Sequence, residues 1–149
     1  MHLNICELHV NIVMGVTGSP HREEVETLRK RAGDFLALTG EALGMGSYDV
    51  SCFLSEQAAQ LHVKSVLLEE VGDYPRAHSI RNLLAEVSRS FGEEEIEVFL
   101  QRNRVRMIAL EDAYIIARYA PARYTREDAE DLLSIAEETI KVASRERKG

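Results

Sequence analysis

Apolar residues recur at spacings of three and four along most of this 149-residue chain. This pattern constrains the fold more than any other feature of the sequence, because it gives an α-helix one apolar face. Glycine and proline divide the pattern into successive segments. The first four segments cover about 19–44, 47–72, 79–92 and 93–120, and the fifth begins at Thr125. The sequence therefore predicts an all-α protein.

Several segments begin with residues that favour a helix N-terminus. Ser19 and Pro20 suit the N-cap and the first helical position of the first segment. Ser79 is placed to cap the third segment, and Thr125 with Asp128 three residues later resembles a capping box. These signals place the predicted helices on the chain.

The connections between the predicted helices are short, so consecutive helices should be antiparallel neighbours. We expect an up-and-down bundle of four long helices, with one shorter crossing helix in third position. Residues 19–149 then form a single helical domain. Residues 1–18 form an N-terminal extension in which Leu8, Val10 and Ile12 alternate with polar residues, as in a short strand. The sequence leaves open whether this extension is ordered.

Charge and composition exclude several classes of protein. The 25 acidic residues outnumber the 18 basic ones, for a net charge of −7. RNA binding would therefore need a local basic patch. The two cysteines lack the number and spacing of a disulfide framework or metal site. We expect no cofactor, and a cytoplasmic protein without a membrane span or signal peptide.

Three stretches, in order along the chain, resemble the HEPN family (higher eukaryotes and prokaryotes nucleotide-binding). The matching residues are Tyr48-Asp49, Gln57-Ala58-Ala59-Gln60 and Lys64 to Leu68 in the first, Tyr74-Pro75-Arg76-Ala77-His78 with Leu83-Leu84 in the second, and Arg118-Tyr119-Ala120-Pro121 with Tyr124-Thr125 in the third. The resemblance implies a nucleotide-binding helical protein that forms a homodimer. It also implies the role of non-catalytic partner of a minimal nucleotidyltransferase, in a toxin–antitoxin-like pair.

The alternative is a metal-independent endoribonuclease, with His78 as the base and Arg76 or Arg118 as the electrostatic stabiliser. Ribonucleases of the wider superfamily carry an arginine followed, after four to six residues, by a histidine. None of the five histidines in this sequence has an arginine at that spacing. The absent spacing argues against RNA cleavage, and whether the chain is an enzyme stays open.

A bound nucleotide would find its phosphate contacts near Arg76, His78 and Arg81, where the third helix begins. Free backbone N–H groups and the helix dipole favour an anion there, and arginine adds a two-pronged donor. Charge from Lys64 or Arg118 would contribute. Gln57 shares a helix face with Lys64, and Tyr74 or Tyr119 would stack the base. For each residue, a structural role in a turn, a cap or the rim of the core stays open.

The second and fourth helices carry more apolar residues than one face needs. The surplus residues are Val63, Val66, Leu67, Ile108, Ile115 and Ile116. A helix that is apolar on two sides requires two partners. We therefore predict a homodimer that packs through its long helices.

Overall fold

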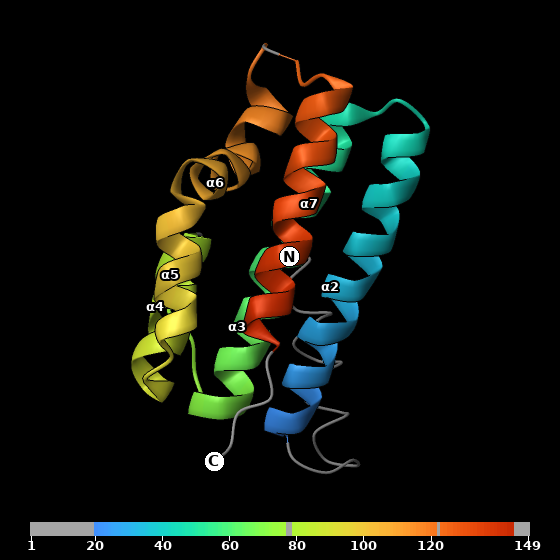
Figure 1. Cartoon of the computed structure of the whole chain (residues 1–149). Coiled ribbons are helices and arrows are strands. Elements are labelled where there is room, and N and C mark those ends of the chain that lie inside the picture. The colour runs from blue at the N-terminus through green and yellow to red at the C-terminus, as the bar shows by residue number, and fades with distance from the viewer. Residues whose placement is uncertain (1–19, 77–78, 122, 145–149) are drawn as a thin grey trace.

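The structure of the chain is a computed structural model that describes residues 20–76, 79–121 and 123–144. Within these ranges the chain forms α2 (Pro20–Gly44), α3 (Tyr48–Val71), α4 (Ile80–Phe91), α5 (Glu94–Arg102), α6 (Arg104–Tyr119) and α7 (Arg126–Ala143). In Figure 1, α2 lies on the right, α3 and α7 in the centre, and α4, α5 and α6 on the left. The predicted all-α bundle is confirmed.

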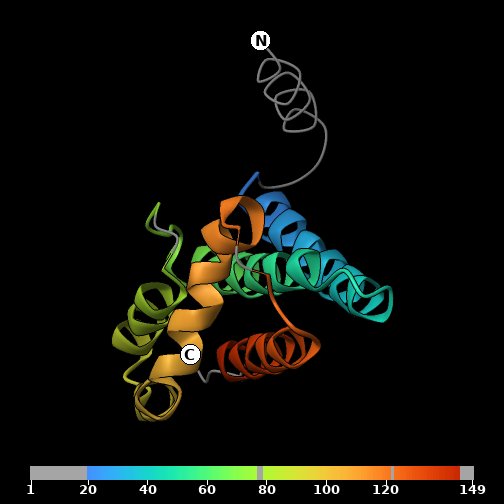
Figure 2. The same ribbon diagram turned by 90° about the horizontal axis from the view of Figure 1, so that it is seen from above.

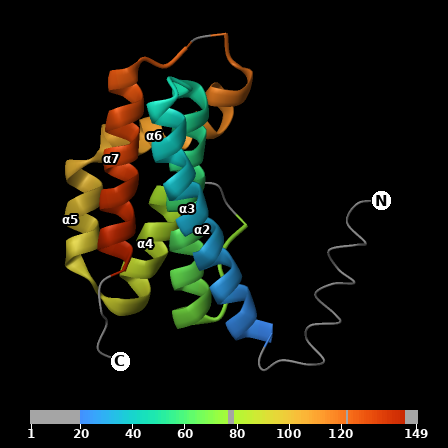
Figure 3. The same ribbon diagram turned by 90° about the vertical axis from the view of Figure 1, so that its right-hand side faces the viewer.

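α3 is the central helix of the bundle. Figure 2 shows α2, α4, α6 and α7 arranged around it, and Figure 3 shows α2 running beside it. Val63, Val66 and Leu67 on α3 are therefore buried within a single chain, at 0%, 5% and 0% exposure. These three residues no longer support the homodimer, which stays a prediction resting on the apolar residues of α6.

Glycines end α3 and α4 where the sequence pattern predicts. Gly72 has a φ of 95°, and its backbone N–H bonds to the carbonyl oxygens of Leu67 and Leu68. Gly92 has a φ of 64° and closes α4 through the carbonyl oxygen of Ser88. Left-handed backbone of this kind carries little cost for glycine. The side chain of Ser79 accepts the N–H of Asn82, so its predicted cap at the start of α4 is confirmed.

The predicted fourth helix is wrong in one respect, because the structure divides it into α5 and α6. The division falls at Asn103, where φ is −114° and ψ is 21°. The Nδ2 of Asn103 donates to the carbonyl oxygen of Phe99 at 3.0 Å. Such local side-chain bonds compete with regular helix. The chain changes direction at this point, so that Figure 2 shows α5 end-on and α6 obliquely.

α7 begins with the capping box that its sequence resembles. Thr125 Oγ1 accepts the Asp128 N–H at 3.1 Å, and Asp128 Oδ2 accepts the Thr125 N–H at 2.9 Å. One residue earlier, the N–H of Tyr124 donates to Asp49 Oδ1 at 2.8 Å. This contact brings the start of α3 beside the start of α7.

α3 and α7 run in the same direction. Asp49 on α3 binds the residue before α7's cap, and His62, further along α3, lies 2.6 Å from the hydroxyl of Ser144, just after α7. The two helices are therefore the non-consecutive, parallel pair of an up-and-down bundle. The predicted extension at 1–18, the cap at Ser19 and the residue His78 lie outside the described residues. No described helix is long and apolar enough to cross a bilayer.

Candidate functional site

A buried carboxylate lies in the middle of the central helix. Glu56 on α3 is 0% exposed. Its Oε1 accepts Gln57 Nε2 at 2.7 Å, and its Oε2 accepts Gln60 Nε2 at 2.6 Å. Burial raises the pKa of Glu56 to about 7, although the two amide hydrogen bonds and the nearby Lys64 oppose the rise. Glu56 therefore changes charge near neutral pH.

The same face of α3 continues from Glu56 to a lysine. Lys64 Nζ donates to Gln60 Oε1 at 2.9 Å, so Gln60 links the ammonium group to the Glu56 carboxylate. Burial lowers the pKa of Lys64, and the charge of Glu56 opposes that shift. Lys64 Nζ also lies 5.4 Å from the ring centroid of Tyr74, a cation–π distance. We call Glu56, Gln57, Gln60 and Lys64 the α3 polar stripe.

A second cluster lies where α6 ends. The Arg118 guanidinium carbon is 5.1 Å from the ring centroid of Phe53, 4.5 Å from that of Tyr114 and 4.7 Å from that of Tyr119. Arg118 Nε donates to the Tyr114 carbonyl oxygen at 2.7 Å, which fixes the side chain. We call these four residues the Arg118 cluster. Tyr119 is 71% exposed, so the cluster presents an aromatic ring to solvent.

The two groups are joined by α3 itself. Phe53 belongs to the Arg118 cluster, and Lys64 ends the α3 polar stripe eleven positions later. At the helical rise this separation is about 16 Å. Gln57 lies one turn from Phe53 and is only partly buried. This face of α3 thus carries Phe53 beside the Arg118 guanidinium of α6 at one end, amides in the middle and the Lys64 ammonium at the other end.

The N-terminus of α4, where the sequence predicts phosphate contacts, already holds a carboxylate. Glu111 Oε2 on α6 accepts the Arg81 backbone N–H at 2.8 Å, and the Arg81 guanidinium lies 3.0 Å from Glu111 Oε1. The Ser79 hydroxyl also donates to Glu111 Oε2, at 3.2 Å. Arg81 is therefore engaged by a residue of its own chain. Arg76 is exposed in the turn that precedes α4, and His78 is outside the described residues.

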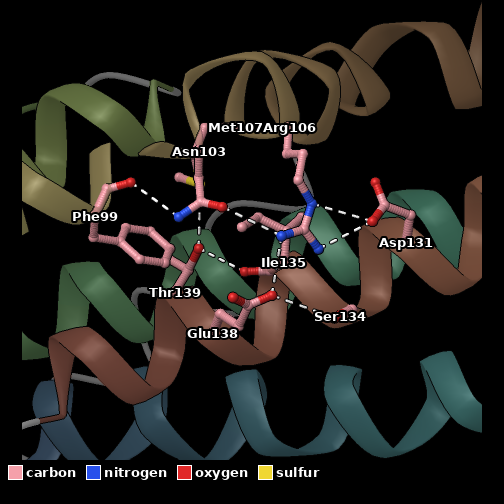
Figure 4. A network of polar contacts seen from close by, with 9 residues as sticks. All are labelled: Phe99, Asn103, Arg106, Met107, Asp131, Ser134, Ile135, Glu138 and Thr139. Atoms are coloured by element: carbon pink, nitrogen blue, oxygen red, sulfur yellow. Dashed lines mark hydrogen bonds and ion pairs between the residues drawn. The ribbon is translucent and has the colours of Figure 1, made fainter. Parts of the chain in front are cut away.

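Arg106, near the start of α6, is paired with carboxylates of its own chain. Arg106 lies 3.0 Å from Asp131 Oδ1 and 3.2 Å from Glu138 Oε2, and both acids belong to α7. Figure 4 shows this network, in which Arg106 also donates to Asn103 Oδ1 at 3.3 Å. Two carboxylates thus offset the charge of Arg106, and the group fastens α6 to α7 beside the division at Asn103.

Burial also shifts the pKa values of His62 and Cys52 on α3. Burial and the nearby Arg29 lower the pKa of His62 to about 4, so its ring is neutral at pH 7. Burial raises the pKa of the Cys52 thiol to about 12, so the thiol is protonated and unreactive there. The described residues contain no group of three or more metal-ligating side chains.

The sequence interpretation missed Glu56 and Glu111. A signal for Glu56 was available, because α3 is rich in small and apolar residues on all sides, so that its charged residues are candidates for burial. Glu111 gave no comparable signal. Its partner Arg81 lies 30 residues away along the chain, and only the packing of α4 against α6 brings them together.

Comparison with known proteins agrees with this fold. The family model for the HEPN domain matches residues 25–147. The crystal structure of TT1696 from Thermus thermophilus is similar, with 28% identity and a TM-score of 0.65 over 80% of this chain and 94% of that chain. ST0689, described as an archaeal HEPN homologue, has 26% identity and a TM-score of 0.56 over 80% of this chain and 93% of its own. No curated protein matches the chain. The chain belongs to the HEPN domain family.

Proposed function

We propose that this protein binds a nucleotide along the face of α3 that carries the α3 polar stripe and the Arg118 cluster. The observation that carries the proposal is the placement of Lys64. Its ammonium group is held by Gln60 and lies beside the Tyr74 ring, on the helix that also supplies Phe53 to the Arg118 cluster. A phosphate would bind at Lys64, and a base would stack at Tyr119.

The proposed site differs from the sequence expectation in the position of the phosphates. Arg81 is bound to Glu111, so we place the phosphates at Lys64 instead of at the start of α4. Arg76, two residues after Tyr74, stays a candidate phosphate contact. The length of the face, about 16 Å from Phe53 to Lys64, is a span that an extended nucleoside triphosphate can bridge.

Within this proposal the chain is the non-catalytic partner subunit of a minimal nucleotidyltransferase, in a toxin–antitoxin-like pair. Membership of the HEPN family supports this role. Glu56 and His62 are hydrogen-bonded to Gln60 and Ser144 of the same chain. Co-expression with the product of a neighbouring nucleotidyltransferase gene tests the role. A stable complex on size-exclusion chromatography is expected, and separate elution would contradict it.

Calorimetric titration with ATP tests the nucleotide site. Lys64→Met removes the charge but keeps most of the side-chain length, and we expect it to weaken binding about tenfold or more, the effect of losing one charge-assisted contact. Lys141→Met, at an exposed position of α7, is the matched control and should bind as wild type. Equal affinity in all three proteins would reject the site. Circular dichroism of each variant establishes that it is folded.

A further inference from the structure

The outward face of α6 carries a second regular pattern, separate from its core face. Val105, Ile108, Asp112, Ile115 and Tyr119 follow one another at spacings of three and four, the a and d positions of a heptad repeat. Val105 is 77% exposed, Ile115 53% and Tyr119 71%. Asp112, the central member, is exposed as well. We call these five residues the α6 seam.

The core does not require the α6 seam. Met107, Leu110 and Ala113 form the inward face of the same helix, and each is 0% exposed. In Figure 1, α6 lies on the left side of the bundle, away from α2. The seam extends for about 21 Å, or four helical turns. A helix with a second, exposed apolar stripe of this length has the form of a surface that receives another helix.

The charge at the centre of the α6 seam decides what kind of helix fits. In a parallel pair of two copies, Asp112 would face Asp112, and the like charges would repel. In an antiparallel pair, an a position meets a d position, so each Asp112 would lie against an isoleucine and lose water without gaining a partner. A polar residue at a single a position is known to specify partner and register in this way.

In place of the homodimer contact predicted through Ile108 and Ile115, we propose that the α6 seam docks one amphipathic helix of a different protein, with a lysine or arginine opposite Asp112. Apolar side chains of that helix would pack between Val105 and Ile115, and the basic residue would pair with the central carboxylate. The proposal deepens the partner-subunit role and rests on it for its biological meaning. It shares Tyr119 with the proposed nucleotide site, so the peptides are tested without nucleotide.

The test uses two synthetic helical peptides three heptads long, with leucine at the outer a and d positions and either lysine or glutamate at the central one. The central charge also disfavours pairing of each peptide with itself, because like charges would meet at one a position. Fluorescence anisotropy with the full chain should show the lysine peptide binding about tenfold or more tightly than the glutamate peptide. The Asp112→Lys variant should reverse that preference.

Ile115→Glu, at an exposed position, should weaken the binding of both peptides, and circular dichroism checks that the variant is folded. Failure of the lysine peptide to bind, or a preference unchanged in Asp112→Lys, would overturn the proposal. Sedimentation equilibrium measures whether the chain associates with itself. Self-association of wild type that Ile115→Glu abolishes would mean that a second copy occupies the seam, and this would also overturn it. The co-expression test reports on the partner-subunit role and the ATP titration on the nucleotide site, so failure of either is distinguishable from failure at the α6 seam.

Discussion

Glu111 on α6 lies at the N-terminus of α4, where its carboxylate accepts the backbone N–H of Arg81 at 2.8 Å and the Arg81 guanidinium lies 3.0 Å from it. One carboxylate thus accepts a free N–H group of the helix, interacts favourably with the helix dipole and pairs with an arginine. The Glu111 side chain is only 12% exposed. The contact ties two helices that are 30 residues apart in the sequence.

We expect Glu111→Ala to destabilise the fold by about 1.5–3 kcal/mol, because it leaves Arg81 and the first turn of α4 without their acceptor. Urea denaturation measures this loss. Glu130→Ala, at an exposed position of α7, is the control and should stay within about 0.5 kcal/mol of wild type. Equal stability of the two variants would show that the contact contributes nothing.

Glu56 should make the stability of the protein depend on pH. Its pKa is raised from the ordinary 4.5 to about 7 in the folded chain. Below 4.5 the carboxyl is protonated in both states, and between 4.5 and 7 only the unfolded chain loses its proton. The free energy of unfolding therefore falls as the pH rises through this window. The full loss, on the order of 3 kcal/mol, is reached above the folded pKa.

Glu56→Gln removes this titration, so its free energy of unfolding should fall less than that of wild type between about pH 5 and about pH 8. Urea denaturation at several pH values in this range compares the two proteins. The slope against pH is the quantity of interest, because the amide also changes the hydrogen bonds to Gln57 and Gln60 at every pH. Parallel curves would mean that Glu56 does not titrate in this window.

The capping box of α7 should be worth about 1 kcal/mol. Thr125→Ala removes the acceptor of the Asp128 N–H, and we expect the melting temperature to fall. Thr27→Ala is a matched control within α2, at an exposed position. There alanine has the higher helix propensity, so that variant should be unchanged or slightly more stable. Similar melting temperatures for both variants would contradict a capping role.

The purified protein should leave RNA intact. The arginine-to-histidine spacing of the superfamily nucleases is absent from the sequence, and the net charge of −7 opposes RNA binding. His62, the described histidine that is packed into the bundle, is bound to Ser144. Incubation with total RNA followed by gel electrophoresis measures cleavage. Cleavage that disappears in His78→Ala would instead support the endoribonuclease function.

The features of this fold that the sequence predicts correctly are local ones. The caps at Ser79 and Thr125 and the stops at Gly72 and Gly92 depend on hydrogen bonds between residues a few positions apart. Such contacts join residues that are close together in the sequence, so a pattern of residue types predicts them. The periodicity of three and four likewise placed most helices within a few residues of their observed bounds.

The division at Asn103 was not predictable from periodicity. A single residue interrupts the helix, so the apolar spacing continues across it almost in phase. The neighbouring Arg106 binds Asp131 and Glu138 on α7, and those contacts exist only once the two helices have packed. Tertiary contacts therefore fixed the direction of α6.

Tertiary structure also decided the candidate site. The sequence shows that Gln57 and Lys64 share a face, but the central position of α3 is what buries Glu56 and raises its pKa. The same packing places Glu111 at α4 and engages Arg81, which the sequence predicted as a phosphate contact. Burial and long-range pairing depend on which helices become neighbours. A helical pattern specifies the faces of each helix and leaves the choice of neighbours to packing.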